Sequence, residues 1–276
     1  MITAIKIIFL LGFLVFIHEF GHYTVAKLCK IKVNEFSLGF GPKLFDKTKG
    51  ETKYQLRAIP LGGFVRLEGE EEHSDVEGSF NKASIPKRIA VLLAGGLVNI
   101  IFGIIAFTVL VTVRHMIVKN SGFMDAIGYG FESCGELIVE LAKGIASLFT
   151  GHLTLNDMTG PVGISSMISK TSGISEFIYL LSIISISLGV TNLLPFVPLD
   201  GGKVVLLIIE AIRKKPIKQE IELKLQTVGF VILIIFSVIV TFHDIMRLWI
   251  VIINQKQDEF LIKSSCFWFV LVVKYK

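Results

Sequence analysis

Apolar and polar positions follow one another along this chain in long blocks. Four apolar runs reach or approach the roughly 20 residues that a helix needs to cross a bilayer, and they cover about 2–28, 89–113, 177–194 and 227–253. The stretch 135–149 instead has helical spacing with Glu136, Glu140 and Lys143 on one side, which predicts an interfacial helix rather than a span. We therefore expect an all-α polytopic membrane protein with about four transmembrane helices.

The composition supports a membrane protein and argues against other classes. Hydrophobic residues make up 52% and charged residues only 18% of the chain, whereas soluble domains carry about 25% charged residues. The net charge is +5 and no helix-turn-helix, RNA-binding or zinc-finger spacing occurs, so the basic residues are typical of cytoplasmic flanks and we expect no nucleic-acid partner. The three scattered cysteines form no C-x-x-C pair and predict neither a disulfide framework nor a cysteine-ligated metal.

The distribution of basic residues predicts an orientation in the membrane. The connection 29–88 carries eleven Lys and Arg residues and 203–224 carries six, whereas the long connection 114–177 carries only four. Basic residues favour the cytoplasmic side, so the first and third connections are predicted to lie inside and the second outside. Both termini are then outside, and the C-terminal end of the first span faces the cytoplasm.

Ionisable residues interrupt the first apolar run. Residues 2–17 resemble a signal peptide, but no small-residue cleavage site follows, so a retained transmembrane helix is predicted. His18, Glu19 and His22 form the pattern HExxH, whose i, i+4 spacing places both imidazoles on one helix face, as two ligands of a tetrahedral zinc site require. Glu19 then lies beside the metal, where it can accept a proton from a zinc-bound water. A polar helix end at the membrane surface is the alternative, but ionisable groups within membrane segments are usually functional.

A catalytic zinc ion needs a third protein ligand and one open position. Asp200 is the best candidate in this sequence, within TNLLPFVPLDGG at 191–202. Two prolines before it break the helix, and two glycines after it allow a tight turn. Broken helices at membrane depth occur where the backbone is buried in protein or lines a wet cavity. An ordinary loop at a membrane exit is the alternative reading.

These motifs together resemble the site-2 protease family of membrane-embedded zinc metalloproteases, and within it the bacterial RseP type. The resemblance rests on segments in the family's order: HEFGH at 18–22, EFSLGFGPKLF at 35–45, PLGGFVRLEGE at 60–70, AGGLVN at 94–99, GPVGI at 160–164, NLLPFVPLDGG at 192–202 and FHDIMRL at 242–248. It implies zinc held by His18, His22 and Asp200, with Glu19 activating water. It also implies a multi-pass protein of the bacterial inner membrane.

The same resemblance assigns further roles. Asn99 would lie near the substrate or the active site, although an amide beside glycines also serves as interhelical contact. Asn192 would bind a substrate backbone, or otherwise cap a helix break. The region 35–67, with Gly62 and Gly63, would form a membrane-associated β-hairpin that presents an extended substrate by strand addition.

Two departures from the family pattern are notable. Members of the RseP type carry one or two PDZ domains between the second and third spans, but 114–177 is too short for a full PDZ domain. Residues 255–276 form a tail of unknown role, after a predicted protease domain at 1–254.

The implied activity is zinc-dependent endopeptidase cleavage within transmembrane segments, that is, regulated intramembrane proteolysis. The expected partners are the lipid bilayer and a single-pass membrane protein substrate, with an anti-sigma factor and a signal-peptide remnant as candidates. The alternative is a catalytically inactive helix-binding protein or a transporter, since broken helices also suit transporters. A transporter, however, has no need of Glu19 beside the first histidine.

Overall fold

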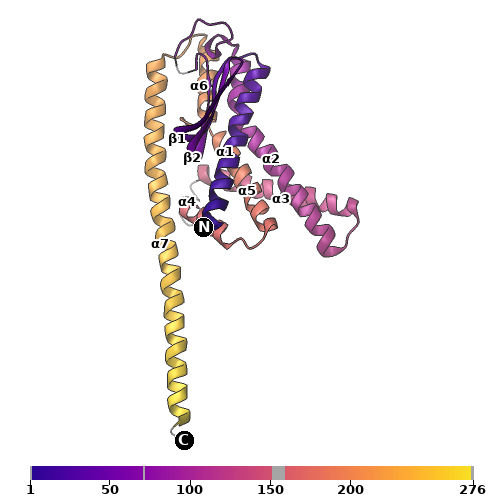
Figure 1. Ribbon diagram of the computed structural model, residues 1–276, viewed down its shortest axis with the longest axis vertical. Coiled ribbons are helices and arrows are strands. Elements are labelled where there is room, and N and C mark those ends of the chain that lie inside the picture. The colour runs from indigo at the N-terminus through magenta and orange to yellow at the C-terminus, as the bar shows by residue number, and fades with distance from the viewer. Residues whose placement is uncertain (1, 71, 151–158, 275–276) are drawn as a thin grey trace.

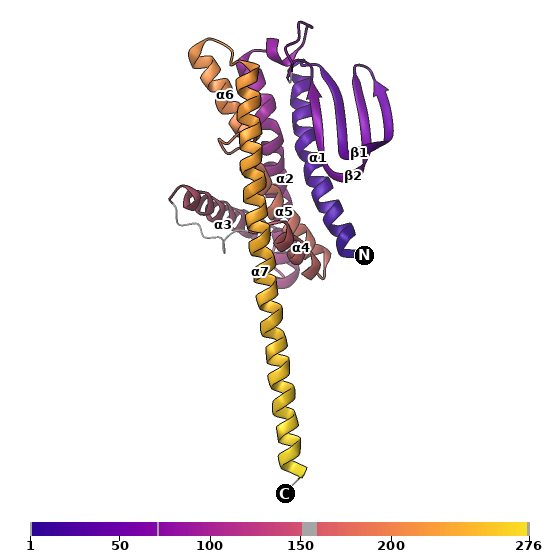
Figure 2. The ribbon, with the colours of Figure 1, turned by 90° about the vertical axis from the view of Figure 1, so that its left-hand side faces the viewer.

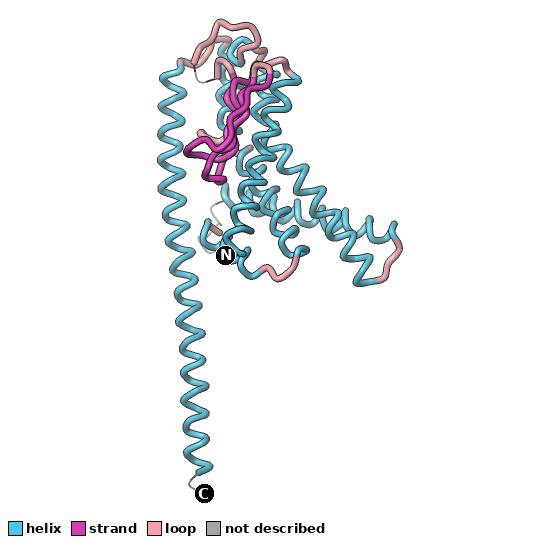
Figure 3. Tube along the Cα trace, viewed as in Figure 1, coloured by secondary structure: helices cyan, strands magenta, loops and turns pink. Residues whose placement is uncertain are grey.

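The computed structural model describes residues 2–70, 72–150 and 159–274 (Figure 1). The elements are, in chain order, α1 (Ile2–Leu28), β1 (Val33–Lys49), β2 (Thr52–Leu67), a single 3-10 turn (Phe80–Lys82), α2 (Ile85–Lys119), α3 (Phe123–Thr150), α4 (Pro161–Lys170), α5 (Ile174–Asn192), α6 (Asp200–Arg213) and α7 (Gln219–Lys274). Helices dominate, and the two strands form one small antiparallel sheet (Figure 3). The expected helical architecture with a β-hairpin is confirmed, and the sheet makes the described fold mostly helical rather than all-α.

Among the described residues, four helices are long and apolar enough to cross a membrane: α1, α2, α5 and the part Gln219–Trp249 of α7. They coincide with the four predicted spans, but α2 and α7 begin before the apolar runs do. A helix satisfies its own backbone hydrogen bonds, so it can continue through polar residues beyond the bilayer. For the same reason α3 is longer than the predicted interfacial helix at 135–149.

Helix α2 lies at the centre of the bundle, with α1 and α5 packed against it (Figure 2). Glycines allow these helices to approach closely. A Cβ atom added to Gly21 of α1 would lie 2.7 Å from the carbonyl oxygen of Ala94, and one added to Gly189 of α5 would lie 2.4 Å from that of Gly96. Small residues at helix crossings are typical of membrane bundles, where close packing replaces the hydrophobic driving force.

The first half of β1 pairs with both halves of β2. Glu35 of β1 pairs with both Lys53 and Arg66 of β2, so the first half of β1 lies between the two halves of β2. Gly39 and Gly41, with φ of 86° and 84°, lie where β1 bends, in a conformation that favours glycine. The second half of β2 therefore lies at one edge of the sheet, with no strand on its outer side among the described residues.

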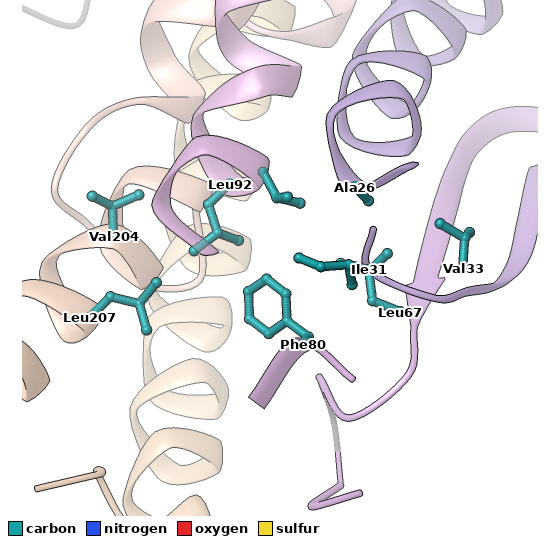
Figure 4. Packing of buried hydrophobic residues seen from close by; sticks show 9 residues of the cluster. Ala26, Ile31, Val33, Leu67, Phe80, Leu92, Val204 and Leu207 are labelled. Atoms are coloured by element: carbon teal, nitrogen blue, oxygen red, sulfur yellow. The ribbon is translucent and has the colours of Figure 1, made fainter. Parts of the chain in front are cut away.

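A hydrophobic cluster joins the sheet to α1, α2 and α6 (Figure 4). Val204 and Leu207 extend from one face of α6 into this cluster, and their partners are Ala26, Ile31, Val33, Leu67, Phe80, Val91 and Leu92. Arg88 of α2 also pairs with Glu210 of α6 at 3.0 Å. These contacts fix the position of α6, which begins with Asp200.

A tight non-helical turn, 193–199, separates α5 from α6. The glycines after Asp200 pack directly on this turn. A Cβ atom added to Gly201 would lie 2.2 Å from the carbonyl oxygen of Leu193, and one added to Gly202 would lie 2.4 Å from the amide nitrogen of Val197. The chain therefore reverses in so little space that only glycine fits, and Asp200 becomes the first residue of α6.

Candidate active site

Three potential metal ligands converge where the first residue of α6 meets α1. The Nε2 atoms of His18 and His22 lie 3.2 Å apart, and Oδ2 of Asp200 lies 3.1 Å and 3.3 Å from them. The histidines are neighbours because they are one helical turn apart. Asp200 joins them only through the packing of α6.

The chemistry of this cluster fits a bound cation. His22 Nδ1 lies 2.8 Å from the carbonyl oxygen of Val91, so it carries the proton that it donates there, and its Nε2 presents a lone pair. Oδ2 of Asp200 is buried without a hydrogen-bond partner in the described part of the chain. Ligands at about 2.0–2.1 Å from a tetrahedral zinc ion are about 3.3 Å apart, which agrees with the separations of these three atoms.

Gly95 of α2 forms the floor of the cluster. A Cβ atom added there would lie 2.3 Å from Nε2 of His22 and 2.8 Å from Cε1 of His18, so any side chain would displace the imidazoles. Our sequence interpretation of AGGLVN singled out Asn99 and missed Gly95. The available signal was the pair of adjacent glycines in the second span.

Glu19 lies where α1 meets the edge of the sheet. A Cβ atom added to Gly63 would lie 3.2 Å from Cγ of Glu19 and 2.9 Å from the carbonyl oxygen of Ser37. The absence of a side chain at Gly63 therefore brings the β2 backbone against the helix turn that carries Glu19. Gly62 instead faces the ring of Phe40 and has a φ of 119°.

The two asparagines lie on different helices, Asn99 on α2 and Asn192 on α5. Asn99 is one helical turn after Gly95 and is 0% exposed, and neither its Oδ1 nor its Nδ2 has a hydrogen-bond partner in the described ranges. Its backbone carbonyl accepts a hydrogen bond from Ser185 of α5 at 2.8 Å. Asn192 is half-buried at the last residue of α5, directly before the turn that leads to Asp200.

A cavity of about 610 Å³ opens between the edge of β2, α6 and the start of α7. Its lining includes Phe64, Val65 and Arg66 of β2, Lys203 of α6, and Glu222, Leu223 and Gln226 of α7. Burial opposes the charge of Lys203, but Glu70, whose Oε1 lies 2.9 Å away, raises the pKa of Lys203 above its ordinary value. The cavity thus contains a stable ion pair one turn from Asp200.

Comparison with known proteins identifies the class. Residues 6–236 match the model of Peptidase family M50, so the chain belongs to this family, the site-2 proteases. It is similar to "Putative zinc metalloprotease CPE1693" of Clostridium perfringens, with 29% identity over 84% of this chain and 95% of that protein. It is also similar to "Putative zinc metalloprotease FN1322" of Fusobacterium nucleatum, with 25% identity over 90% of this chain and 99% of that protein.

A further relative is "Zinc metalloprotease RasP" of Bacillus licheniformis, with 24% identity over 90% of this chain and 100% of that protein. The chain is therefore a zinc-dependent metalloprotease with several membrane-spanning helices, as the sequence predicts. The alignment with RasP covers 421 positions, whereas this chain has 276 residues. That relative therefore contains residues without a counterpart here.

Proposed function

We propose that this metalloprotease cleaves peptide bonds within the transmembrane segments of other membrane proteins, with Glu19 as general base. The observation that carries this proposal is the position of the ligand cluster within a candidate span. His22 lies six residues before the end of α1 at Leu28, which corresponds to about 9 Å along the helix. A peptide bond that reaches this cluster would thus be at membrane depth.

His18, His22 and Asp200 are the proposed zinc ligands. A zinc ion bound there supplies Lewis-acid polarisation of a carbonyl group and lowers the pKa of water. Glu19, adjacent to His18 on α1, accepts the proton of the attacking water and then donates it to the amine of the leaving strand. The floor at Gly95 and the hydrogen bond from His22 to Val91 hold the imidazole rings in place.

The substrate is proposed to bind as an extended strand. A transmembrane helix hides its amides in internal hydrogen bonds, so it must unwind before its backbone is attacked. The edge of β2 has no strand partner in the described ranges and faces the 610 Å³ cavity, and Gly63 brings this edge against Glu19. Strand addition at this edge would place the unwound backbone beside the base.

Asn99 and Asn192 are proposed to bind the remaining backbone groups of the unwound segment. The buried amide of Asn99 has no partner in the described structure, and burial of an unpaired amide costs about 1–3 kcal/mol. A substrate carbonyl or amide would remove this cost. Asn192 lies directly before the turn that leads to Asp200, where it would bind a second backbone group of the unwound segment.

We place the protein in a bacterial inner membrane with the site toward the cytoplasm. The basic connections 29–88 and 203–224 support this orientation, with both termini outside. Residues 1–254 form the proposed protease domain, without a full PDZ domain in 114–177, and 255–276 form a tail. Substrates would be single-pass membrane proteins, of which an anti-sigma factor and a remnant signal peptide are the candidate types.

The test is cleavage of a single-pass model substrate by the purified protein in liposomes, with mass spectrometry to locate the cut. We expect products that end within the apolar segment. A chelator should stop the cleavage and added zinc should restore it. Cleavage only in the extramembrane flanks would contradict the proposal, and binding without any cleavage would favour the inactive helix-binding alternative.

A further inference from the structure

The ion pair between Glu70 and Lys203 connects the two halves of the proposed active site. Glu70 lies three residues after the end of β2, the strand whose edge approaches Glu19. Lys203 lies on α6, one helical turn after Asp200. Their side chains are 20% and 27% exposed, and Nζ of Lys203 lies 2.9 Å from Oε1 of Glu70. The pair therefore bridges the strand-binding edge and the helix that carries the third zinc ligand.

The position of Lys203 is electrostatically unfavourable unless a carboxylate accompanies it. The N-terminus of a helix carries a partial positive charge, so a cation in the first turn of α6 is disfavoured. A zinc ion held by Asp200 would add further repulsion. Glu70, which pairs with Lys203 directly, is the largest source of compensation for both effects, and the carboxylates of Asp200 and Glu222 add to it.

Glu70 is itself held in place by its neighbours. The side chain of Glu68 accepts a hydrogen bond from Asn34 at 2.6 Å, and this bond lowers the pKa of Glu68. The backbone of Glu68 accepts a hydrogen bond from the amide of Phe80 at 2.7 Å. At Gly69, which has a φ of +75°, an added Cβ would lie 2.0 Å from Oδ1 of Asn81. The segment that presents Glu70 is thus tightly packed against its surroundings.

We propose that Glu70 is a positioning residue for the metal site. Its ion pair with Lys203 fixes the first turns of α6, and thereby Asp200, relative to the edge of β2. Glu70 also neutralises a cation near the metal. This inference rests on the proposed ligand set of His18, His22 and Asp200. It gives Glu70 a role that does not require contact with the metal or with the substrate.

The test compares zinc affinity in four variants of the full-length protein, measured by competition with a chelator. Glu70→Gln should weaken zinc binding up to about tenfold, the lower end of the range for groups that hydrogen-bond a metal ligand directly, because Glu70 acts through Lys203. Lys203→Met should weaken it less, because no unpaired cation is left. The double variant should bind zinc more tightly than Glu70→Gln alone. Glu210→Gln, which breaks the other ion pair of α6 with Arg88, is the matched control and should stay near the parent protein.

A second readout uses the metal-free protein and does not depend on catalysis. Hydrogen exchange at the amides of residues 201–206 should be faster in Glu70→Gln than in Glu210→Gln. Unchanged zinc affinity in Glu70→Gln would overturn the inference, and so would equal losses in Glu70→Gln and Glu210→Gln. If both Glu70→Gln and Asp200→Ala bind zinc as the parent protein does, the proposed ligand set is wrong. If zinc binding is weakened only in Asp200→Ala, the ligand set is correct and Glu70 has no positioning role.

Discussion

Two aspartates, the half-buried Asp200 on α6 and the buried Asp244 on α7, have opposite surroundings. Oδ2 of Asp244, a residue only 4% exposed, accepts the backbone N–H of Gly163 at 2.7 Å. This N–H belongs to the first turn of α4, where unpaired donors and the helix dipole favour a carboxylate. Oδ2 of Asp200 instead faces two imidazole nitrogens. A carboxylate among donors stabilises a fold, whereas one among acceptors provides a site for a cation.

The contact made by Asp244 also gives a structural role to two segments that had none from the sequence. GPVGI at 160–164 and FHDIMRL at 242–248 form one contact, because Asp244 caps the helix that GPVGI begins. A Cβ added to Gly160 would lie 2.8 Å from Oδ2 of Asp244, so the glycine leaves room for the carboxylate. The two segments thus hold α7 against α4, and nothing in this contact requires a metal.

The largest expected effect comes from Glu19, which follows the proposed ligand His18 on α1. Glu19→Gln keeps the size and polarity of the side chain but removes the base, so the cleavage rate should fall about 10²- to 10⁴-fold. Zinc content, measured by metal analysis, should not change. Full activity in this variant would contradict the proposed mechanism.

Replacement of Asp200 tests the cation-binding side of the comparison. Asp200→Ala removes a direct ligand, so zinc affinity should fall by more than the roughly 100-fold upper range for outer partners. The measurement is chelator competition on the purified protein. Unchanged zinc occupancy would assign the third ligand to another residue.

Gly95→Ala should have an intermediate effect on the same site. Its Cβ would overlap the imidazoles of His18 and His22, and we expect about a tenfold loss of zinc affinity from their displacement. Gly128→Ala is the control, because nothing lies within 4 Å of its added Cβ. Equal zinc affinity in both alanine variants would show that zinc binding does not require the absence of a side chain at Gly95.

Asp244→Asn should have the smallest effect and should change stability alone. The amide oxygen can still accept the hydrogen bond from Gly163, so the variant loses only the interaction of the charge with the helix dipole, about 0.3–1 kcal/mol of folding free energy, which a lower thermal unfolding midpoint in detergent would report. Zinc affinity should remain within about twofold of the parent protein. Strong zinc loss in Asp244→Asn would remove the distinction between the two aspartates.

The local parts of this protein could be predicted from its sequence. The apolar runs predicted four membrane helices because a helix of about 20 apolar residues is what a bilayer requires. The pattern HExxH predicted adjacent imidazoles on one face because the spacing of four residues is close to one helical turn. Both predictions depend only on residues that are near one another in the chain.

Only the tertiary structure decided which distant residues meet. It placed Asp200 against His18 and His22, Gly95 beneath the imidazoles, and Gly63 against Glu19. Asp200 was the best third-ligand candidate in the sequence because of its place after a proline- and glycine-rich helix break, and the family resemblance supported it. The roles of Gly95 and Asp244 had no such support. These contacts arise where α1, α2, the sheet and the start of α6 meet. The fit of complementary surfaces, unlike helical periodicity, is not encoded in the spacing of neighbouring residues.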